Sequence, residues 1–157
     1  MSASTEAIVG LIRARLLTYV PSTTTPLTTL LGGRLYYDQA PAAGSVTPKY
    51  PYATYRLMNR IESEGYAGMR ETGDIEVLFF GRPRGHPTTG LWAIERCADV
   101  ADEALLDWNA VSDGIAFSRF RVRDTLPLPL DGMDRDLVTL RCVFPVVLWP
   151  TYRTTHA

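Results

Sequence analysis

Cysteine is scarce in this sequence, and a long hydrophobic run is missing. The only cysteines are Cys97 and Cys142, and two thiols so far apart in the chain build neither a disulfide framework nor a zinc knuckle. We expect both to be small buried apolar residues. The longest apolar run, Cys142–Trp149, is interrupted by Pro145 and falls far short of the roughly 20 residues that a membrane-spanning helix needs. We therefore expect no membrane partner.

An excess of charge of either sign is also lacking. The 16 Lys and Arg residues against 17 Asp and Glu residues give a net charge of -1, whereas a nucleic-acid-binding protein needs a basic excess to neutralise the phosphate backbone. The 157 residues, 46% hydrophobic and 21% charged, have the size and composition of one globular domain. We expect a single domain over residues 1–157, with no basic and then apolar N-terminal segment of the kind that directs export.

Residues that could support catalysis are few. The two histidines are His86, in a Gly-His-Pro turn, and His156, beside the C-terminus, and neither has a second His, Cys or carboxylate at ligand spacing. The stretch 81–85 is rich in Gly and Arg but lacks the Lys-Ser/Thr ending of a phosphate-binding loop. The acidic residues between Asp99 and Asp107 are typical of a solvated helix face. We expect no enzyme activity, no cofactor and no bound metal.

The hydrophobic pattern predicts an α+β fold. Helical periodicity covers residues 5–19 and about 88–108, and a leucine-rich turn at 27–31 precedes Gly32 and Gly33. Alternation of apolar and polar residues predicts strands at 34–38, 52–59, 73–80, 115–123 and 137–149. We expect a mostly antiparallel sheet of about five strands with two helices packed on one face, and the other face open.

The last of these strands is apolar on both faces. Its even-numbered residues from Val138 to Leu148 point one way, while Leu137, Val143, Val147 and Trp149 make the opposite face apolar as well. Pro145 donates no backbone hydrogen bond, so the strand is expected at a sheet edge, or bulged there.

Three arginines form a stripe on the preceding strand. Arg119, Arg121 and Arg123 share one face of the predicted strand 115–123. The stripe could bind phosphates or an acidic partner, or it could be a solvated face that pairs across strands with Glu76 or its neighbours.

Two further features favour contact with other proteins. Residues 60–72 are too rich in charged residues and glycine to be buried and should project from the predicted hairpin as a polar arm. Trp92 and Leu106 lie on the charged face of the second helix, where they are either contact residues for a neighbouring subunit or scattered exposed apolar side chains.

The succession of these segments resembles the tail-terminator, or tail-completion, proteins of long-tailed bacteriophages and related prophages. The resemblance covers nearly the whole chain. The motifs that carry it are Gly33-Arg34-Leu35-Tyr36-Tyr37-Asp38 followed by Pro41, and Pro51-Tyr52 at the start of the second strand. The long loops at 39–51 and 124–136 depart from a simple mapping of interface residues.

The resemblance implies a structural virion protein that forms a ring, usually of six subunits. Such a ring caps the finished tail tube, ends its polymerisation and offers a surface to the head connector. The expected partners are therefore other copies of the chain, the tail tube protein and a head-tail connector or stopper protein, with DNA only as cargo passing through the ring. The protein would be assembled in the host cytoplasm and located at the head-proximal end of the tail.

A ring needs two different contact patches on each subunit. Candidate subunit-interface residues are Trp92, Leu106, Val143, Val147 and Trp149. The arm, as a mobile loop that orders on docking, is the candidate contact with the tube through Glu62, Glu64, Tyr66, Met69, Arg70 and Glu71; its acidic residues could instead line a DNA passage. Residues 150–157 are expected to be a flexible tail.

Two alternatives to a tail terminator are kept. One is another head-tail joining protein, such as a stopper or adaptor, of similar size and without an active site. The other is a small α+β ligand-binding domain or enzyme, although the sequence offers no nucleophile and base pair that would predict one.

Overall fold

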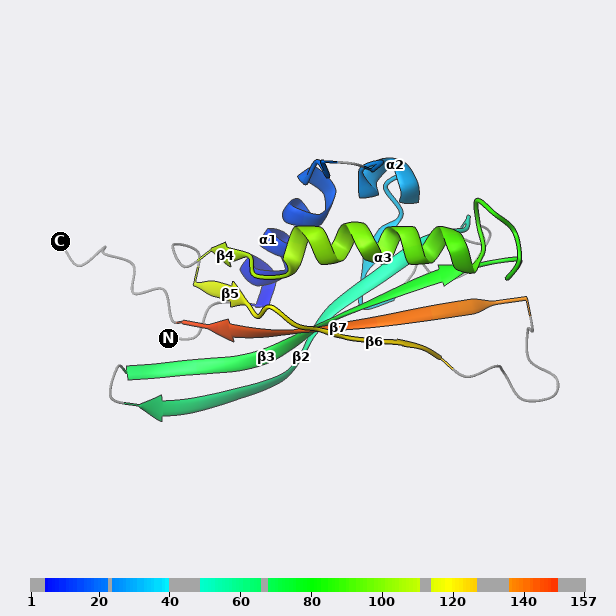
Figure 1. Ribbon diagram of the computed structural model, residues 1–157. Coiled ribbons are helices and arrows are strands. Elements are labelled where there is room, and N and C mark those ends of the chain that lie inside the picture. The colour runs from blue at the N-terminus through cyan, green and yellow to red at the C-terminus, as the bar shows by residue number, and fades with distance from the viewer. Residues whose placement is uncertain are drawn as a thin grey trace.

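Three helices cover one face of a seven-stranded sheet in the computed structural model (Figure 1). The structure describes residues 5–22, 24–39, 49–65, 68–110, 114–126 and 136–149, without the side chains of 63–65 and 68–70. The helices are α1 (Thr5–Thr18), α2 (Leu27–Leu31) and α3 (Leu91–Leu105). The predicted α+β fold is confirmed, with the leucine turn as a short third helix and seven strands in place of five.

The sheet is antiparallel except at one edge. Its strands are β1 (Leu35–Tyr37), β2 (Tyr52–Gly65), β3 (Gly68–Gly81), β4 (Asn109–Ala110), β5 (Ile115–Phe117), β6 (Val122–Thr125) and β7 (Val138–Leu148). Their order is β1-β2-β3-β7-β5-β4, and β6 pairs with β7 beyond the end of β5. Only β1 runs parallel to its neighbour.

The helices form where the apolar spacing predicts them. In α1, Ile8, Ile12 and Leu16 recur every four residues and are buried, which places one helical stripe against the sheet. The short α2 buries Leu27 and Leu31. It ends because Gly32 adopts a φ of 59°, a left-handed conformation that closes helices and favours glycine.

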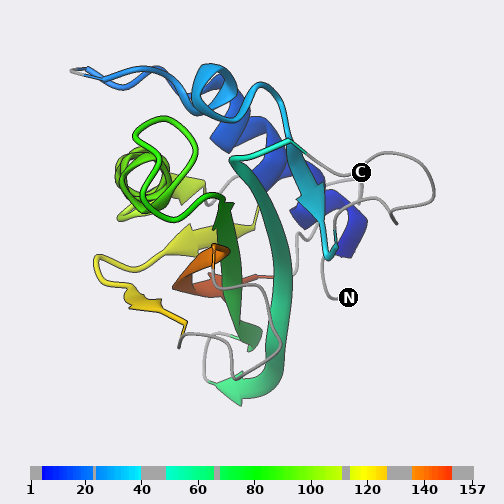
Figure 2. The same ribbon diagram turned by 90° about the vertical axis from the view of Figure 1, so that its right-hand side faces the viewer.

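Helix α3 lies over the centre of the sheet, against β3 and β7, and Figure 2 views it nearly along its axis. Its buried face consists of Ala93, Ile94, Cys97, Ala98, Val100, Ala101, Ala104 and Leu105. The many small residues in this face allow the helix backbone to approach the strands closely. Figure 1 shows all three helices on the same side, and none of the described elements covers the opposite face, which we call the outer face.

The predicted polar arm has a different form from the one expected. Residues 60–72 are not a loop, because β2 and β3 continue as paired strands as far as Gly65 and Gly68. A register shift between Met58 and Ile61 accompanies this extension, which we call the β2–β3 ribbon, residues 59–74. The buried charge of the ribbon is paired: Arg60 binds Glu71 at 2.7 Å, and Glu71 is buried rather than exposed.

Strand β7 is central rather than an edge strand. It pairs with β3 on one side and with β5 and β6 on the other, so the prediction of a sheet edge is wrong. The predicted alternation is confirmed, since the even-numbered residues from Val138 to Leu148 are all buried. The missing donor of Pro145 is accommodated because the predicted strand 115–123 breaks opposite this residue, between β5 and β6.

Candidate protein-contact surface

The outer face of the sheet carries an apolar patch where β7 meets its neighbours. Val143 and Val147 lie on this face, as the sequence predicts, with Pro145 between them. Val143 pairs with Val122 of β6, which is itself exposed, and Val147 pairs with Ala116 of β5. Exposed apolar residues that gather on one face are typical of a surface that contacts another protein.

A groove of about 420 Å³ lies at one end of this patch. Its walls are the β2–β3 ribbon on one side and the turn between β5 and β6 on the other. The lining residues are Asn59, Ile61, Thr72, Gly73, Asp74, Ala116, Phe117, Ser118, Phe120, Pro145, Val146 and Val147. Two of these side chains, Ile61 and Phe120, are 62% and 69% exposed. The groove is therefore an open apolar channel in the outer face.

Sequence reasoning missed Ile61 and Phe120. Ile61 lies in a segment that the composition predicts to be a polar loop. The sequence feature that could have identified it is that Ile61 and Met69 are the only large aliphatic residues between Arg60 and Thr72. Phe120 was assigned to a continuous strand. The break after Phe117 instead places it in the turn that leads to β6, where it stays exposed.

A single negative charge lies in the groove. Asp74 accepts a hydrogen bond from the side-chain amide of Asn59 at 3.0 Å, and among the described residues no cation lies within ion-pair distance of its carboxylate. Glu62, one residue beyond Ile61, is also exposed. The hydroxyl of Ser118 donates to the backbone carbonyl of Phe120 at 2.9 Å. Because Glu62 is on the opposite face of the ribbon from Ile61, the groove is apolar with one carboxylate, that of Asp74.

Ion pairs border the apolar patch and connect four strands across the outer face. Glu76 is only 4% exposed, and its carboxylate lies 2.8 Å from Arg56 Nε and 3.9 Å from Arg141 Nη1. Arg141 also binds Asp124 of β6 at 3.1 Å. The hydrogen bond to Asp124 raises the pKa of the Arg141 guanidinium, which therefore stays charged. This cluster gives the sheet a polar region next to the groove.

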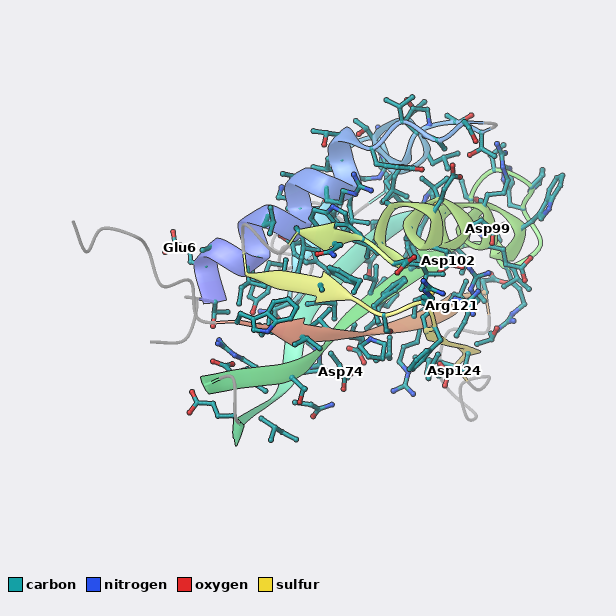
Figure 3. All side chains as sticks on the ribbon, turned by 60° about the vertical axis from the view of Figure 1, so that its left-hand side comes forward. Glu6, Asp74, Asp99, Asp102, Arg121 and Asp124 are labelled. Atoms are coloured by element: carbon teal, nitrogen blue, oxygen red, sulfur yellow. The ribbon has the colours of Figure 1, made fainter. Side chains whose placement is uncertain are left out.

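The predicted arginine stripe is divided between two environments, because Arg119 is exposed whereas Arg121 and Arg123 are half-buried. Arg121 and Arg123 face the helix layer, where both bind Asp102 of α3 and Arg123 also binds Asp99 at 3.0 Å (Figure 3). The hydrogen bond that Arg121 donates to Asp102 raises the pKa of the Arg121 guanidinium. The predicted pairing of the stripe with Glu76 is therefore wrong, because Arg121 and Arg123 lie on the face of the sheet that the helices cover, whereas Glu76 lies on the outer face beside Val143. Asp102 is correspondingly only 14% exposed at its side chain, rather than fully solvated.

The remaining candidate interface residues lie in different places. Trp92 is 64% exposed on α3, on the opposite side of the sheet from the groove. Leu106 is not on the exposed helix face: α3 ends at Leu105, Leu106 has extended backbone, and its side chain packs against the core. Trp149 is half-buried, and its amide donates to the carbonyl of Gly114 at 2.8 Å.

The candidate tube-contact residues are only partly described. Glu62 is exposed as predicted, whereas Glu71 is buried against Arg60. The side chains of Glu64, Met69 and Arg70, and residue Tyr66 as a whole, lie outside the described part of the structure, as does the predicted tail 150–157.

The two thiols are enclosed by the core. Burial raises the pKa of Cys97 to about 12 and that of Cys142 to about 11, so both stay protonated and unreactive at neutral pH. Across the described ranges, no group of three or more His, Cys, Asp or Glu side chains is arranged to hold a metal ion. None of the described helices is long and apolar enough to cross a bilayer.

Comparison with known proteins finds a similar structure but no relative by sequence. No family model matches the sequence, and no curated protein is similar to it in sequence. Among solved structures, the fold is similar to that of a chain described as "Virion of native gene transfer agent (GTA) particle", with a TM-score of 0.56. The alignment covers 87% of this chain and 90% of that chain at 15% sequence identity. At this identity, the two chains share a fold along nearly their whole lengths.

Proposed function

We propose that this chain is a structural protein of a phage-like virion that forms a ring at the head-proximal end of a tail tube. The ring would end tube polymerisation and bind the head connector. In the tail-terminator proteins that the sequence resembles, such a ring usually has six subunits. The observation that carries the proposal is the likeness to a virion chain across 87% of this chain and 90% of the other. A shared fold over both lengths is what two proteins with a common architectural role would have, although a fold alone does not determine function.

The distribution of exposed apolar residues supports a subunit with several protein partners. Ile61, Phe120 and Val122 are exposed on or beside the outer face, and Trp92 is exposed on the helix layer. A ring is built from heterologous contacts, in which one patch of a subunit meets a different patch of the next. Two apolar surfaces on opposite layers of the molecule satisfy this requirement.

The chemistry of the groove favours protein contact over catalysis. Asp74 is the only acidic or basic residue among its lining residues, and the Ser118 hydroxyl is occupied with the Phe120 carbonyl. A nucleophilic serine needs a base within hydrogen-bond distance. The groove therefore suits an apolar side chain of a partner.

The β2–β3 ribbon is the proposed contact with the tube, and it is a pair of strands rather than a mobile loop. Strand β7 pairs with β3 only as far as Glu71, so the ribbon continues past the end of its neighbour. A paired ribbon is more ordered than a loop, and Arg60 also donates to the hydroxyl of Thr5 at the start of α1. The contact residues would then be positioned before the tube is met.

A binding experiment with purified components tests the proposal. This chain is mixed with polymerised tail tubes, which are then sedimented, and separately with the isolated head-connector protein of the same virion, which is then captured. The amount of this chain bound is measured in each case. We expect this chain to bind one end of the tube, at a ratio of about one ring per tube. Binding to the connector alone, with none to the tube, would overturn the proposal in favour of a stopper or adaptor.

A further inference from the structure

The exposed indole of Trp92 and the groove on the outer face are compatible in size, and the charges beside them are opposite. Trp92 is 64% exposed at the start of α3, where water contact of so large an apolar group is unfavourable. The groove on the outer face has a volume of about 420 Å³, which is enough for an aromatic side chain. Tryptophan is the residue type most enriched among the side chains that dominate binding energy at protein interfaces.

The charges beside the two features are opposite. Arg96 lies one helical turn after Trp92 on the same exposed face, and it forms no hydrogen bond or ion pair with any other described residue. The loop that carries Arg82 and Arg84 packs against the first turn of α3, where the Leu91 amide donates to the Arg84 carbonyl at 2.9 Å. The neighbouring acids on α3 are Glu95 and Asp99, and Asp99 is already paired with Arg123 at 3.0 Å. The groove, in contrast, contains Asp74 without a cationic partner among the described residues.

The distance between the apolar residue and the charged residue is also similar on the two surfaces. Trp92 and Arg96 are four residues apart on a helix, a rise of about 6 Å. In the groove, Val147 of β7 pairs with Thr72 of β3. Asp74 lies two residues beyond Thr72 on β3, which places it diagonally from Val147 at about 7–8 Å. An indole placed over Val147 would therefore bring a guanidinium near the carboxylate of Asp74.

Each feature is out of reach of the other within one molecule. Figure 3 shows α3, with Asp99, on one side of the sheet and Asp74 on the other. Contact between them requires a second copy of the chain, and it joins two different surfaces, as a ring contact must.

We infer that Trp92 of one copy inserts into the groove of the next, with its indole against Phe120 and Val147 and with Arg96 beside Asp74. This inference rests on the proposed ring assembly and assigns its subunit contact. The occupant of the groove is thus a second copy of this chain.

Disulfide trapping between engineered cysteines tests this contact. The native thiols of Cys97 and Cys142 are buried, so they do not compete. In the protein alone under mild oxidation, the variant W92C/F120C should form a ladder of covalent oligomers, whereas W92C and F120C should remain monomeric when each is oxidised by itself. The matched control is V20C/F120C, because Val20 is 75% exposed on the helix layer but lies near the other end of α3: its neighbours Tyr19 and Ser22 bind Glu103 in the last turn, whereas Trp92 is in the first.

A charge exchange gives an independent readout. Either D74K or R96E alone places like charges together and should weaken self-association, measured by sedimentation, at least about tenfold. The double variant D74K/R96E should recover most of that loss. Both residues are at the surface, and circular dichroism checks that each variant is folded.

The outcomes separate this contact from the proposed function. Rings on tubes without cross-linking of W92C/F120C overturn the contact and leave the function standing. Cross-linking with bare tubes supports the contact and counts against tube capping. Disulfide links between the F120C residues of two copies would show a symmetric contact and overturn the inference. Groove variants that lose tube binding but keep self-association would also overturn it, because the groove would then hold a tube protein.

Discussion

At the residue scale, the described charges that are buried have partners of opposite sign. Glu71 binds Arg60, Glu76 binds Arg56, and Asp102 of α3 binds two arginines from the chain segment that leads into β6. Burial of a charge without a partner would cost several kcal/mol, so these pairs explain why strongly charged segments form regular structure here. They also explain why composition alone misread residues 60–72 as a loop.

Substitution of Asp102 tests this reading directly. Asp102→Asn keeps the shape but removes the charge that Arg121 and Arg123 share, and we expect a loss of about 1–3 kcal/mol in unfolding free energy, measured by urea titration. Asp99→Asn is the matched control, because Asp99 binds the same Arg123 but is largely exposed, and its loss should stay below about 1 kcal/mol. Equal effects of the two substitutions would contradict the account.

The buried thiols predict a decline of stability in alkali. The native pKa values of Cys97 and Cys142 are raised to about 12 and about 11 from 9.0. Above pH 9 the unfolded chain releases these protons while the folded chain keeps them, so unfolding becomes more favourable as the pH rises. Each thiol adds a slope of about 1.4 kcal/mol per pH unit. Alanine at both positions should flatten this part of the pH profile of stability; an unchanged slope would show that the thiols are not buried.

At the scale of the elements, the start of α3 depends on close backbone packing. Gly90 precedes the helix, and a Cβ atom there would lie 2.3 Å from the carbonyl oxygen of Arg84 and 2.5 Å from that of Pro83. A side chain at this position would therefore push the preceding loop away from the helix and move the first turn, which carries Trp92.

Alanine substitutions at two nearby glycines separate this effect from the general cost of replacing glycine. Gly90→Ala should destabilise the protein by about 1–3 kcal/mol, read as a lower midpoint in thermal unfolding. Gly85→Ala, in the same loop but with open space around its Cβ, should change stability by no more than about 0.5 kcal/mol. If both variants have the same midpoint of thermal unfolding as the unsubstituted protein, the close approach at Gly90 is not a constraint.

The same scale shows what the sequence could predict. Helices α1 and α3 and the long β7 follow from periodicity, because each buries one regular stripe of apolar residues over many residues. The split between β5 and β6 could not be predicted, since alternation continues through the break and only the pairing with β7 reveals a change of register. Leu106 was misplaced for a related reason: a helical wheel does not show where the helix ends.

At the scale of the whole molecule, the candidate surface was predicted in part. The apolar outer side of β7 was visible in the sequence because alternation fails there, at Val143 and Val147. The groove was not, because its walls come from the ribbon and from the β5–β6 turn, segments far apart in the chain that only the folded sheet brings together. Trp92 was identified by its position on a charged helix face, and its exposure confirms that placement.

Substitutions in the groove should abolish assembly without disturbing the fold. Phe120→Ser removes an exposed apolar side chain, so the free energy of unfolding should change by no more than about 0.5 kcal/mol, while self-association measured by light scattering should be lost. Leu126→Ser, at another exposed apolar residue outside the groove, is the control and should assemble normally. Loss of assembly in both variants would indicate a general surface effect.

The most direct test of the central claim is electron microscopy of polymerised tail tubes mixed with the purified protein. The account predicts ring-shaped densities at one end of the tubes and no further elongation from that end when tube protein is added. Tubes that keep growing, with both ends bare and no annular particles in the field, would contradict it.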